Sequence, residues 1–342
     1  MEFGRRLFSL LKTSKKEDEE LFLSAGNTSA QLEELIASSN GGQGIPIRRF
    51  TAKELIKATN NFKEIVGYTG NCHIFTGSFD KSPILVKKFR EFSPDRSLSG
   101  AIRDIVITSR MSQHKNVLKL LGFSIEFKIP VLVYECAWTK VEQLPNLLYP
   151  RPKTAFRWKN RLRIATDIGN AIAYLHTAFP APIVYRDLNP QNIVIDQDGV
   201  AKLLEFSLST SIPPGESSVE DCVVGTTGYG DPEYTITGII TLKTDVYMFG
   251  MLLLVLLTGK KPLDPYSGSL KDCVKDHVKN NRFNKILDDT ILAEDGGIRK
   301  EQQLQASVAL ALRCVENKGE NRPELVEVVE KLRWIERSVH LF

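Results

Sequence analysis

The eight residues Tyr185-Arg186-Asp187-Leu188-Asn189-Pro190-Gln191-Asn192 decide the fold of this 342-residue chain. They follow a helical run from Trp158 to Phe179 and precede the short segment Glu205-Phe206-Ser207. Their meaning depends on the strands and helices that the sequence predicts on either side of them.

Short β-type runs separated by Gly, Asp and Pro dominate the chain before this stretch. We predict strands at Ile65-Val66, His73–Phe79, Ile84–Phe89, Val117–Phe123 and Val131–Glu135, and helices at Phe50–Phe62 and Ala101–Gln113. After a loop that contains several prolines, the pattern is mainly helical. We predict helices at Trp158–Phe179, Leu242–Leu257, Leu270–Asn280, Gln303–Glu316 and Pro323–Val339. A small β-rich lobe followed by a larger helical lobe is an α+β, bilobal architecture.

We divide the chain into four segments on this basis. Residues 1–45 form a partly flexible leader with a short helix at Gln31–Ala37. Residues 46–61 form an N-terminal helical extension, in which Thr51 and Glu54 have the spacing of a capping box. Residues 62–137 form the β-rich N-lobe and residues 138–342 the helical C-lobe.

The composition excludes several classes of protein. Apolar residues make up 42% and charged residues 25% of the chain, as in ordinary folded proteins. A net charge of +4 spread along the chain argues against a nucleic-acid binder. The five cysteines form no CxxC pair, which argues against a disulfide framework or a zinc site and fits a reducing compartment. The N-terminus lacks a secretory signal, Glu2 breaks the myristoylation pattern, and the apolar run Val246–Thr258 is too short to span a membrane.

Six motifs in order resemble the protein-kinase signature set and cover about residues 62 to 338. They are Ile84-Leu85-Val86-Lys87, the Tyr185–Asn192 stretch, Glu205-Phe206-Ser207, Asp231-Pro232-Glu233, Asp245-Val246-Tyr247-Met248-Phe249-Gly250 and Arg322-Pro323. The resemblance implies the bilobal kinase fold, with ATP and magnesium as the cofactors of a working member.

Two further segments resemble plant receptor-like and receptor-like cytoplasmic kinases. They are Arg49-Phe50-Thr51 with Ala58-Thr59-Asn60-Asn61-Phe62, and Gly225-Thr226-Thr227-Gly228-Tyr229-Gly230-Asp231-Pro232-Glu233-Tyr234. Because we find no transmembrane segment before the domain, we expect the cytoplasmic branch and a cytoplasmic location, with recruitment to the plasma membrane through partners.

The phosphate loop of the family is degraded here. A working kinase uses a G-x-G-x-x-G loop so that backbone amides can approach the phosphates. In Gly67-Tyr68-Thr69-Gly70-Asn71-Cys72 the first glycine is kept, and Thr69 and Cys72 replace the other two. A plain hairpin turn between two strands is the alternative interpretation.

The resemblance also implies a changed nucleotide pocket. Lys87 matches the phosphate-binding lysine, Leu85 replaces the small residue that packs on adenine, and Tyr134 with Cys136 would line and narrow the back of the pocket. The glutamate that normally pairs with the lysine falls at Ile105, or at Asp104 with one insertion. We therefore expect Lys87 to lack its usual partner.

The catalytic loop is kept in part. Asp187 resembles the residue that accepts the proton of the substrate hydroxyl, and Asn192 resembles a magnesium ligand. Asn189 replaces the catalytic lysine, and Tyr185 replaces the usual histidine. Arg186 is retained and could clamp a phosphorylated or otherwise anionic loop.

Glu205 stands where the family has the aspartate that binds magnesium. Magnesium requires near-ideal octahedral geometry, and glutamate moves its carboxylate by about 1.5 Å. A 1 Å misplacement can cost on the order of 10²-fold in rate. We expect phosphoryl transfer at least about 10³-fold below that of a competent kinase, and no required cofactor.

Residues that maintain the fold are retained, in contrast. Glu233 and Arg322 resemble a buried ion pair, and Asp245 and Gly250 resemble residues that brace the catalytic loop. Trp158 and Phe206 are expected in the core. Random decay would have damaged both sets, so we interpret the chain as a kinase-shaped surface with a binding role.

This combination resembles the ZED-related pseudokinases of plants. The resemblance implies an adaptor for a coiled-coil, leucine-rich-repeat NLR immune receptor, which recognises a receptor-like cytoplasmic kinase modified by a bacterial effector. The activation segment, residues 208–230, is the predicted surface that recognises the modified kinase. Its candidate contact residues are Ser209, Ser217, Thr226 and Thr227. Lys202 or Arg186 would have to supply positive charge for an anionic ligand. A mobile surface loop is the plainer interpretation.

The receptor face has weaker candidates, namely the leader helix at Gln31–Ala37 and the Phe50–Phe62 segment. Packing of these segments on the chain's own small lobe is the alternative. For the whole chain the alternative function is an active, atypical Ser/Thr kinase, which retention of Lys87, Asp187 and Asn192 would favour.

Overall fold

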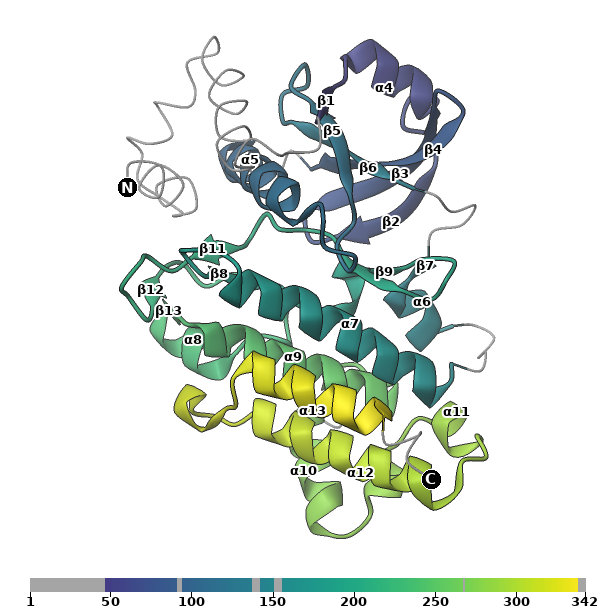
Figure 1. The fold of residues 1–342 in the computed structure, drawn as a ribbon, viewed down its shortest axis with the longest axis vertical. Helices are drawn as coiled ribbons and strands as arrows, with labels where there is room; N and C mark the ends of the chain where they lie inside the picture. The colour runs from purple at the N-terminus through teal and green to yellow at the C-terminus, as the bar shows by residue number, and fades with distance from the viewer. Residues whose placement is uncertain (1–46, 91–93, 137–141, 151–155, 267, 338–342) are drawn as a thin grey trace. The chain divides into compact units, whose positions relative to one another are not determined.

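The computed structural model describes residues 47–90, 94–136, 142–150, 156–266 and 268–337, and Figure 1 labels most of their helices and strands. The predicted leader helix lies outside these residues. The described residues form two compact units. The N-terminal unit contains the described residues before 142 together with 202–211, and the C-terminal unit contains those from 142 to 201 and from 212 onward.

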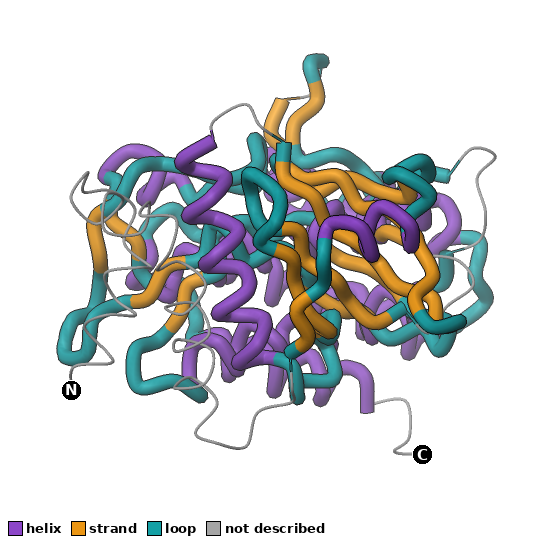
Figure 2. The backbone as a smooth tube through the Cα atoms, turned by 90° about the horizontal axis from the view of Figure 1, so that it is seen from above, coloured by secondary structure: helices purple, strands orange, loops and turns teal. Residues whose placement is uncertain are grey.

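The N-terminal unit is built on a six-stranded sheet in the order β1-β5-β6-β4-β3-β2. Its strands are β1 (Arg48–Arg49), β2 (Ile65–Thr69), β3 (Cys72–Phe79), β4 (Ser82–Phe89), β5 (Leu120–Ser124) and β6 (Val131–Glu135). β1 pairs with β5 in parallel, and every other neighbouring pair is antiparallel. Figure 2 shows these strands in orange, seen from above. All five predicted strands are present, although β5 begins later than predicted, because Val117 instead forms a bridge with Leu203.

Two helices complete this unit. α4 (Ala52–Ala58) begins with the predicted capping box, in which Thr51 and Glu54 satisfy each other's backbone N–H groups. α5 (Pro94–Met111) begins at Pro94 rather than at the predicted Ala101. The early start agrees with the preference for proline in the first helical turn, where a backbone N–H is not needed.

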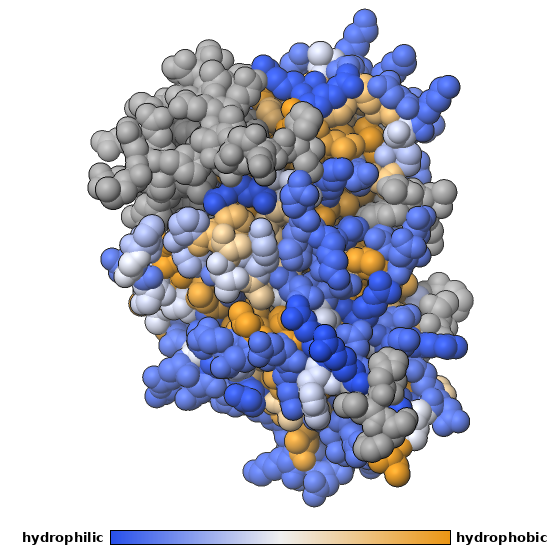
Figure 3. Space-filling model, in the orientation of Figure 1, coloured by the Kyte–Doolittle hydropathy of each residue, from blue (hydrophilic) through white to orange (hydrophobic). Residues whose placement is uncertain are grey.

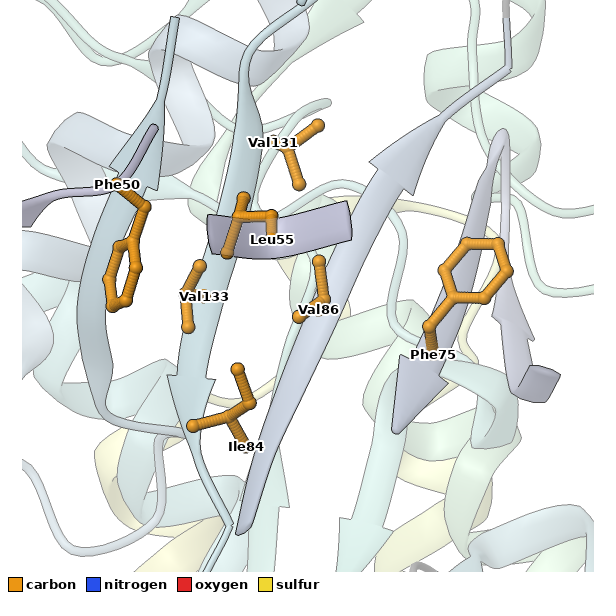
Figure 4. Close-up of a cluster of buried hydrophobic side chains, with 7 residues drawn as sticks. All are labelled: Phe50, Leu55, Phe75, Ile84, Val86, Val131 and Val133. Carbon is orange, nitrogen blue, oxygen red and sulfur yellow. The ribbon is translucent and has the colours of Figure 1, made fainter. Parts of the chain in front are cut away.

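The core of this unit joins α4 to the sheet. Phe50 and Leu55 belong to a buried cluster, and the sheet contributes its other members: Phe75, Ile84, Val86, Val131 and Val133. Figure 4 shows Leu55 lying across the strands that carry Val86 and Val133. The Phe50–Phe62 segment therefore packs on its own unit, which was the alternative to a receptor-docking surface.

A glycine allows β1 to approach this sheet. A Cβ atom at Gly122 would lie 2.0 Å from the carbonyl oxygen of Arg48 and 2.7 Å from the ring of Phe50. Because such contacts cannot form, any larger residue at position 122 would push β1 away from β5.

Helices form most of the C-terminal unit. They are α6 (Leu144–Leu148), α7 (Trp158–Thr177), α8 (Pro232–Thr237), α9 (Leu242–Thr258), α10 (Leu270–Lys279), α11 (Asp289–Leu292), α12 (Gly297–Cys314) and α13 (Leu325–Arg337), with 3-10 turns at Pro190–Asn192, Phe283–Lys285 and Gly319–Asn321. The five predicted helices are present with shifted ends; α12 begins at Gly297, ahead of the predicted Gln303.

The remaining strands are short. They are β7 (Glu142–Gln143), β8 (Ile183–Val184), β9 (Ile193–Ile195), β10 (Ala201–Leu203), β11 (Thr210–Ser211), β12 (Val219–Glu220), β13 (Ile239–Ile240), β14 (Leu263–Asp264) and β15 (Gly268–Ser269). The chain is therefore of the α+β class, with the large sheet in the N-terminal unit and most helices in the C-terminal unit.

Helix α9 is the centre of the C-terminal unit. Its side chains are buried from Thr244 to Thr258, and it packs against α7, α10 and α12. Gly250 of α9 allows close packing on α12. A Cβ atom there would lie 2.6 Å from the Cβ of Cys314. Trp158 and Phe206 are buried, as predicted.

Although α9 is strongly apolar, no helix within the described ranges has the length and apolar character needed to cross a membrane. On the face shown in Figure 3, hydrophilic side chains predominate and hydrophobic ones form separate small patches.

The core position of α4 can be tested by mutation. We expect Leu55→Ala to lower the free energy of unfolding by about 2–4 kcal/mol, because Leu55 is fully buried and the variant leaves a cavity. The matched control is Ile56→Ala on the same helix, where 42% of the side chain is exposed. Urea unfolding followed by circular dichroism measures both. Equal losses in the two variants would contradict the packing described.

Candidate active site

One face of the N-terminal sheet collects the residues predicted to line a nucleotide pocket. Leu85 and Tyr134 are paired neighbours on β4 and β6, and both are buried. Lys87 lies two residues after Leu85 and therefore points to the same face. Gly67 and Cys136 are also buried. The bulky side chains of Leu85 and Tyr134 thus lie together.

The predicted phosphate loop is a hairpin between β2 and β3. Thr69 and Cys72 pair across its two-residue turn, in which Gly70 has a positive φ of 38°. The side chains of Thr69 and Cys72 are fully buried. The two residues that replace glycines therefore place their side chains inside the unit rather than in solvent.

Lys87 does not lack a partner, so that prediction was wrong. Its Nζ atom forms an ion pair with Asp104 of α5, and a second one with Oε2 of Glu205 at 2.7 Å. Thr108, one helical turn after Asp104, donates a hydrogen bond of 2.9 Å to Oδ1 of Asp104. The short aspartate suffices because packing of α5 brings it to β4, and counting residues along the sequence cannot supply that distance.

Glu205 connects this ion pair to the hairpin. Thr69 Oγ1 donates a hydrogen bond of 2.8 Å to the same Oε2 atom that Lys87 contacts. The backbone N–H of Ser207 donates to the other oxygen, Oε1, at 3.2 Å. Two separate departures from the kinase pattern, Thr69 and Glu205, therefore contact each other.

Burial and charge both act on this cluster. Burial opposes the charge of Lys87, but Asp104 and Glu205 outweigh it and raise the pKa of the ammonium well above its ordinary value. Burial raises the pKa of Asp104 despite the nearby cation. Burial also opposes ionisation of Glu205, but Lys87 prevails and lowers the pKa of that carboxyl. The cluster therefore holds a buried charge pair between Lys87 and Glu205.

In the arrangement observed, the residues of this cluster cannot bind a nucleotide and its metal, because their polar atoms bind one another. Both oxygens of Glu205 accept hydrogen bonds from the chain, and Lys87 is shared by two carboxylates. A magnesium ion at Glu205, or a phosphate at Lys87, would have to displace these contacts. Nor do the described residues contain a group of three or more His, Cys, Asp or Glu side chains able to hold a metal ion.

The catalytic loop of the C-terminal unit keeps its carboxylate in a closed network. Oδ1 of Asp187 accepts a hydrogen bond of 2.6 Å from Thr226, and Oδ2 accepts one of 2.9 Å from Nδ2 of Asn192. Asn189, which stands in the place of a lysine, donates to Thr226 Oγ1 at 3.0 Å. Asn189 is therefore a neutral side chain in the place of a cation, and it holds the hydroxyl of Thr226 that donates to Asp187.

Asn192 differs from Glu205 in one respect. Its Oδ1 atom is buried and has no hydrogen-bond partner in the part of the chain that the structure describes. A carbonyl oxygen of this kind could coordinate a cation. Of the two predicted magnesium ligands, Glu205 therefore has both oxygens in hydrogen bonds. Asn192 has an amide oxygen without a hydrogen-bond partner among the described residues.

Asp245 braces the catalytic loop, as predicted. Its carboxylate accepts hydrogen bonds from the backbone N–H groups of Tyr185 at 2.8 Å and Arg186 at 2.9 Å. His176 of α7 lies 2.8 Å from the same carboxylate. Sequence analysis missed His176, because it belongs to no motif and only its short distance from Asp245 in the structure identifies it.

The anion that holds Arg186 comes from the chain itself. The Arg186 guanidinium pairs with Asp221 at 2.9 Å, and it donates to the carbonyl of Cys222 at 2.8 Å and to the hydroxyl of Tyr234 at 2.7 Å. Arg186 is fully buried. Of the two cations considered for an external anion, Arg186 is thus already engaged, and Lys202 donates to the carbonyl of Lys115 at 2.7 Å.

The prediction of a buried ion pair between Glu233 and Arg322 was wrong about the acidic partner, which is Asp231. Arg322 pairs in bidentate fashion with Asp231, at 2.7 Å for each oxygen. Glu233 is exposed and accepts a hydrogen bond of 2.7 Å from the backbone N–H of Gly319. Asp231 is the N-cap of α8, and its Oδ1 atom also accepts a hydrogen bond of 3.0 Å from the backbone N–H of Glu233.

The four candidate contact residues of the activation segment differ in exposure. Ser217 and Thr227 are exposed, whereas Ser209 is buried and offers no surface to a partner. Thr226 is half-buried and its hydroxyl is used by Asp187.

Comparison with known proteins agrees with this geometry. The protein kinase domain family matches residues 66–334, and the chain belongs to that family. The predicted α+β kinase fold is therefore confirmed.

Relatives from Arabidopsis thaliana narrow the comparison. The chain is 39% identical to the non-functional pseudokinase ZED1, over 90% of this chain and 94% of ZED1. It is 36% identical to the non-functional pseudokinase ZRK2, over 96% of this chain and 94% of ZRK2. It is also 36% identical to the serine/threonine-protein kinase ZRK1, over 96% of each chain. The predicted resemblance to the ZED-related group is confirmed, and that group includes proteins named as pseudokinases and as kinases.

Removing the central cation should be costly. We expect Lys87→Met to lower the free energy of unfolding by about 3–5 kcal/mol, because it leaves two buried carboxylates without their counter-charge. The matched control is Lys88→Met, the next residue, whose ammonium has no carboxylate partner among the described residues. Chemical denaturation measures both. The same denaturation midpoint for the two variants would contradict the buried cluster.

The Arg186–Asp221 pair should order the activation segment without phosphorylation. We expect Asp221→Asn to speed amide hydrogen exchange at residues 219–224 by at least about tenfold, because the variant removes the carboxylate from a buried guanidinium. Glu220→Gln changes the exposed neighbour and should leave exchange unchanged. Hydrogen exchange measured by mass spectrometry gives both rates. Unchanged exchange in Asp221→Asn would mean that other contacts hold the segment.

Proposed function

We propose that the chain is a catalytically impaired pseudokinase that acts through its surface. The observation that carries this proposal is the buried cluster of Thr69, Lys87, Asp104 and Glu205. In a working kinase the lysine contacts nucleotide phosphates and the carboxylate of the Asp-Phe-Gly motif holds magnesium. In this chain the same two positions are paired with each other.

The proposed impairment has two physical sources. Binding of a triphosphate would require breaking ion pairs that are fully buried and hydrogen-bonded, which opposes binding. The longer Glu205 side chain also shifts its carboxylate by about 1.5 Å from the position that suits magnesium, and such displacements cost orders of magnitude in rate. We therefore propose that no cofactor is required for function.

We propose further that the chain is an adaptor in plant defence. Its partners would be a coiled-coil NLR immune receptor, through its leucine-rich repeats, and a modified receptor-like cytoplasmic kinase. The resemblance to the ZED-related group supports this role. So does the exposure of Ser217 and Thr227 on an activation segment that Asp221 and Arg186 hold in place. We propose a cytoplasmic location, with recruitment to the plasma membrane through these partners.

An active, atypical Ser/Thr kinase is the second candidate, and specific observations favour it. Asp187 is held by Asn192 and Thr226, and Lys87 pairs with a carboxylate of α5. The Oδ1 atom of Asn192 has no hydrogen-bond partner among the described residues. The relative ZRK1 is named as a serine/threonine-protein kinase. This candidate requires the pair of Lys87 and Glu205 to open when nucleotide arrives.

A nucleotide titration separates the two candidates. A ligand at 100 times its Kd stabilises a protein by about 2.7 kcal/mol, which raises the melting temperature by several degrees. We expect no rise with millimolar Mg-ATP in the wild-type chain, and no phosphate transfer to itself or to a generic substrate. The paired change Thr69→Gly with Glu205→Asp should produce a rise, because the shorter carboxylate withdraws from Lys87, which keeps Asp104 as its partner, and the glycine restores space at the hairpin.

Transfer by the wild-type chain that disappears in Asp187→Ala would overturn the pseudokinase proposal. The adaptor role is tested separately by co-purification with a plant coiled-coil NLR and a receptor-like cytoplasmic kinase. Complex formation should be the same for the wild-type chain and Asp187→Ala. A complex that forms with the wild-type chain but not with Asp187→Ala would indicate that assembly requires catalysis and not only the binding surface.

A further inference from the structure

The sheet face opposite Lys87 carries a group of positive and aromatic side chains that the proposed function does not use. We call Tyr68, His73, Lys88 and Arg90 the cationic strip. His73 pairs with Tyr68 on β2 and with Lys88 on β4, so these three lie side by side across three strands. Arg90 directly follows β4.

Direct contacts join the members of the strip. Nε of Arg90 donates a hydrogen bond of 2.9 Å to Nε2 of His73. The His73 and Tyr68 rings pack edge to face at 5.3 Å, and the Arg90 guanidinium lies 5.8 Å from the centre of the Tyr68 ring. The Lys88 ammonium lies 4.8 Å from the centre of the Phe62 ring. Aromatic rings, rather than carboxylates, therefore hold both cations.

The positive charge of the strip is not neutralised within the described residues. Neither Lys88 nor Arg90 forms an ion pair there, and the imidazole of His73 accepts its hydrogen bond from a cation. Burial, then Arg90 and Lys88, lower the pKa of His73, and no carboxylate contributes to that shift. The Lys88 ammonium and the terminal nitrogens of Arg90 are thus donors that an oxyanion could accept from.

Backbone contacts hold the strip in place. The N–H of Arg90 donates a hydrogen bond of 2.8 Å to the carbonyl of Asn71 in the hairpin turn. The carbonyl of Arg90 accepts one of 3.0 Å from Ser97 Oγ of α5. Because hydrogen bonds hold both its backbone N–H and its carbonyl, Arg90 loses less conformational entropy when it binds a ligand than an arginine on a mobile loop would lose.

The strip lies beside an open sheet edge. β2 is the last strand of the sheet, so among the described residues one side of its backbone has no neighbouring strand. Its side chains at Ile65 and Tyr68 are 42% and 50% exposed. Edge strands of this kind accept an extended peptide by strand addition, and neighbouring side chains then select among peptides.

We propose that the cationic strip binds a phosphomonoester, presented by phosphoserine or phosphothreonine in an extended segment of a partner protein that lies along β2. Arg90 offers a planar pair of donors to two phosphate oxygens, Lys88 supplies a second charge, and the Tyr68 ring borders the site. This site is separate from the buried cluster and does not depend on the pseudokinase proposal.

Binding of labelled peptide pools to the full chain tests the proposal. One pool of degenerate nonapeptides carries a central phosphoserine, and the other carries serine. We expect the phosphoserine pool to bind at least about tenfold more tightly, and added salt to weaken it. The paired change Lys88→Gln with Arg90→Gln should remove this difference.

Lys53→Gln with Lys57→Gln is the matched control, because it removes two exposed lysines from α4 of the same unit. It should keep the tenfold preference. Thermal unfolding of each variant checks that the fold is intact. Equal binding of the two pools, or the same loss in the control variant, would overturn the proposal. Binding of inorganic phosphate or of phosphoinositide vesicles, with no preference between the peptide pools, would overturn it as well.

Discussion

A single buried cation organises the N-terminal unit. An ammonium removed from water is stable only when opposite charge and hydrogen bonds replace its hydration. Lys87 meets this requirement with Asp104 and Glu205, which are supplied by α5 and by the 202–211 segment. The cation therefore ties a strand, a helix and a distant segment together, and the position of each depends on it.

The same cation explains why two changed motifs belong together. Considered separately, Thr69 is a lost glycine and Glu205 is a misplaced metal ligand. In the structure the hydroxyl of Thr69 and the ammonium of Lys87 bind the same oxygen of Glu205. The additional methylene of glutamate carries this oxygen to both donors. The two substitutions thus form one interaction, and its members satisfy one another without a nucleotide.

Carboxylates have a comparable role in the C-terminal unit. Asp245 holds the backbone of the catalytic loop, Asp221 holds Arg186, and Asp231 holds Arg322. Asp187 itself receives donors from Asn192 and Thr226. The residues that would perform chemistry are thus built into the same polar network as the residues that maintain the fold, which explains how this loop keeps its architecture whether or not it transfers phosphate.

The sequence by itself determined the order of strands and helices, the capping box at Thr51 and the family, because apolar periodicity and motif spacing are local properties of the chain. It also located the altered positions Thr69, Asn189 and Glu205. Only the tertiary structure decided which charges meet: Asp104 with Lys87, and Asp231 rather than Glu233 with Arg322. An ion pair requires atoms within about 4 Å, and packing between distant segments sets that distance.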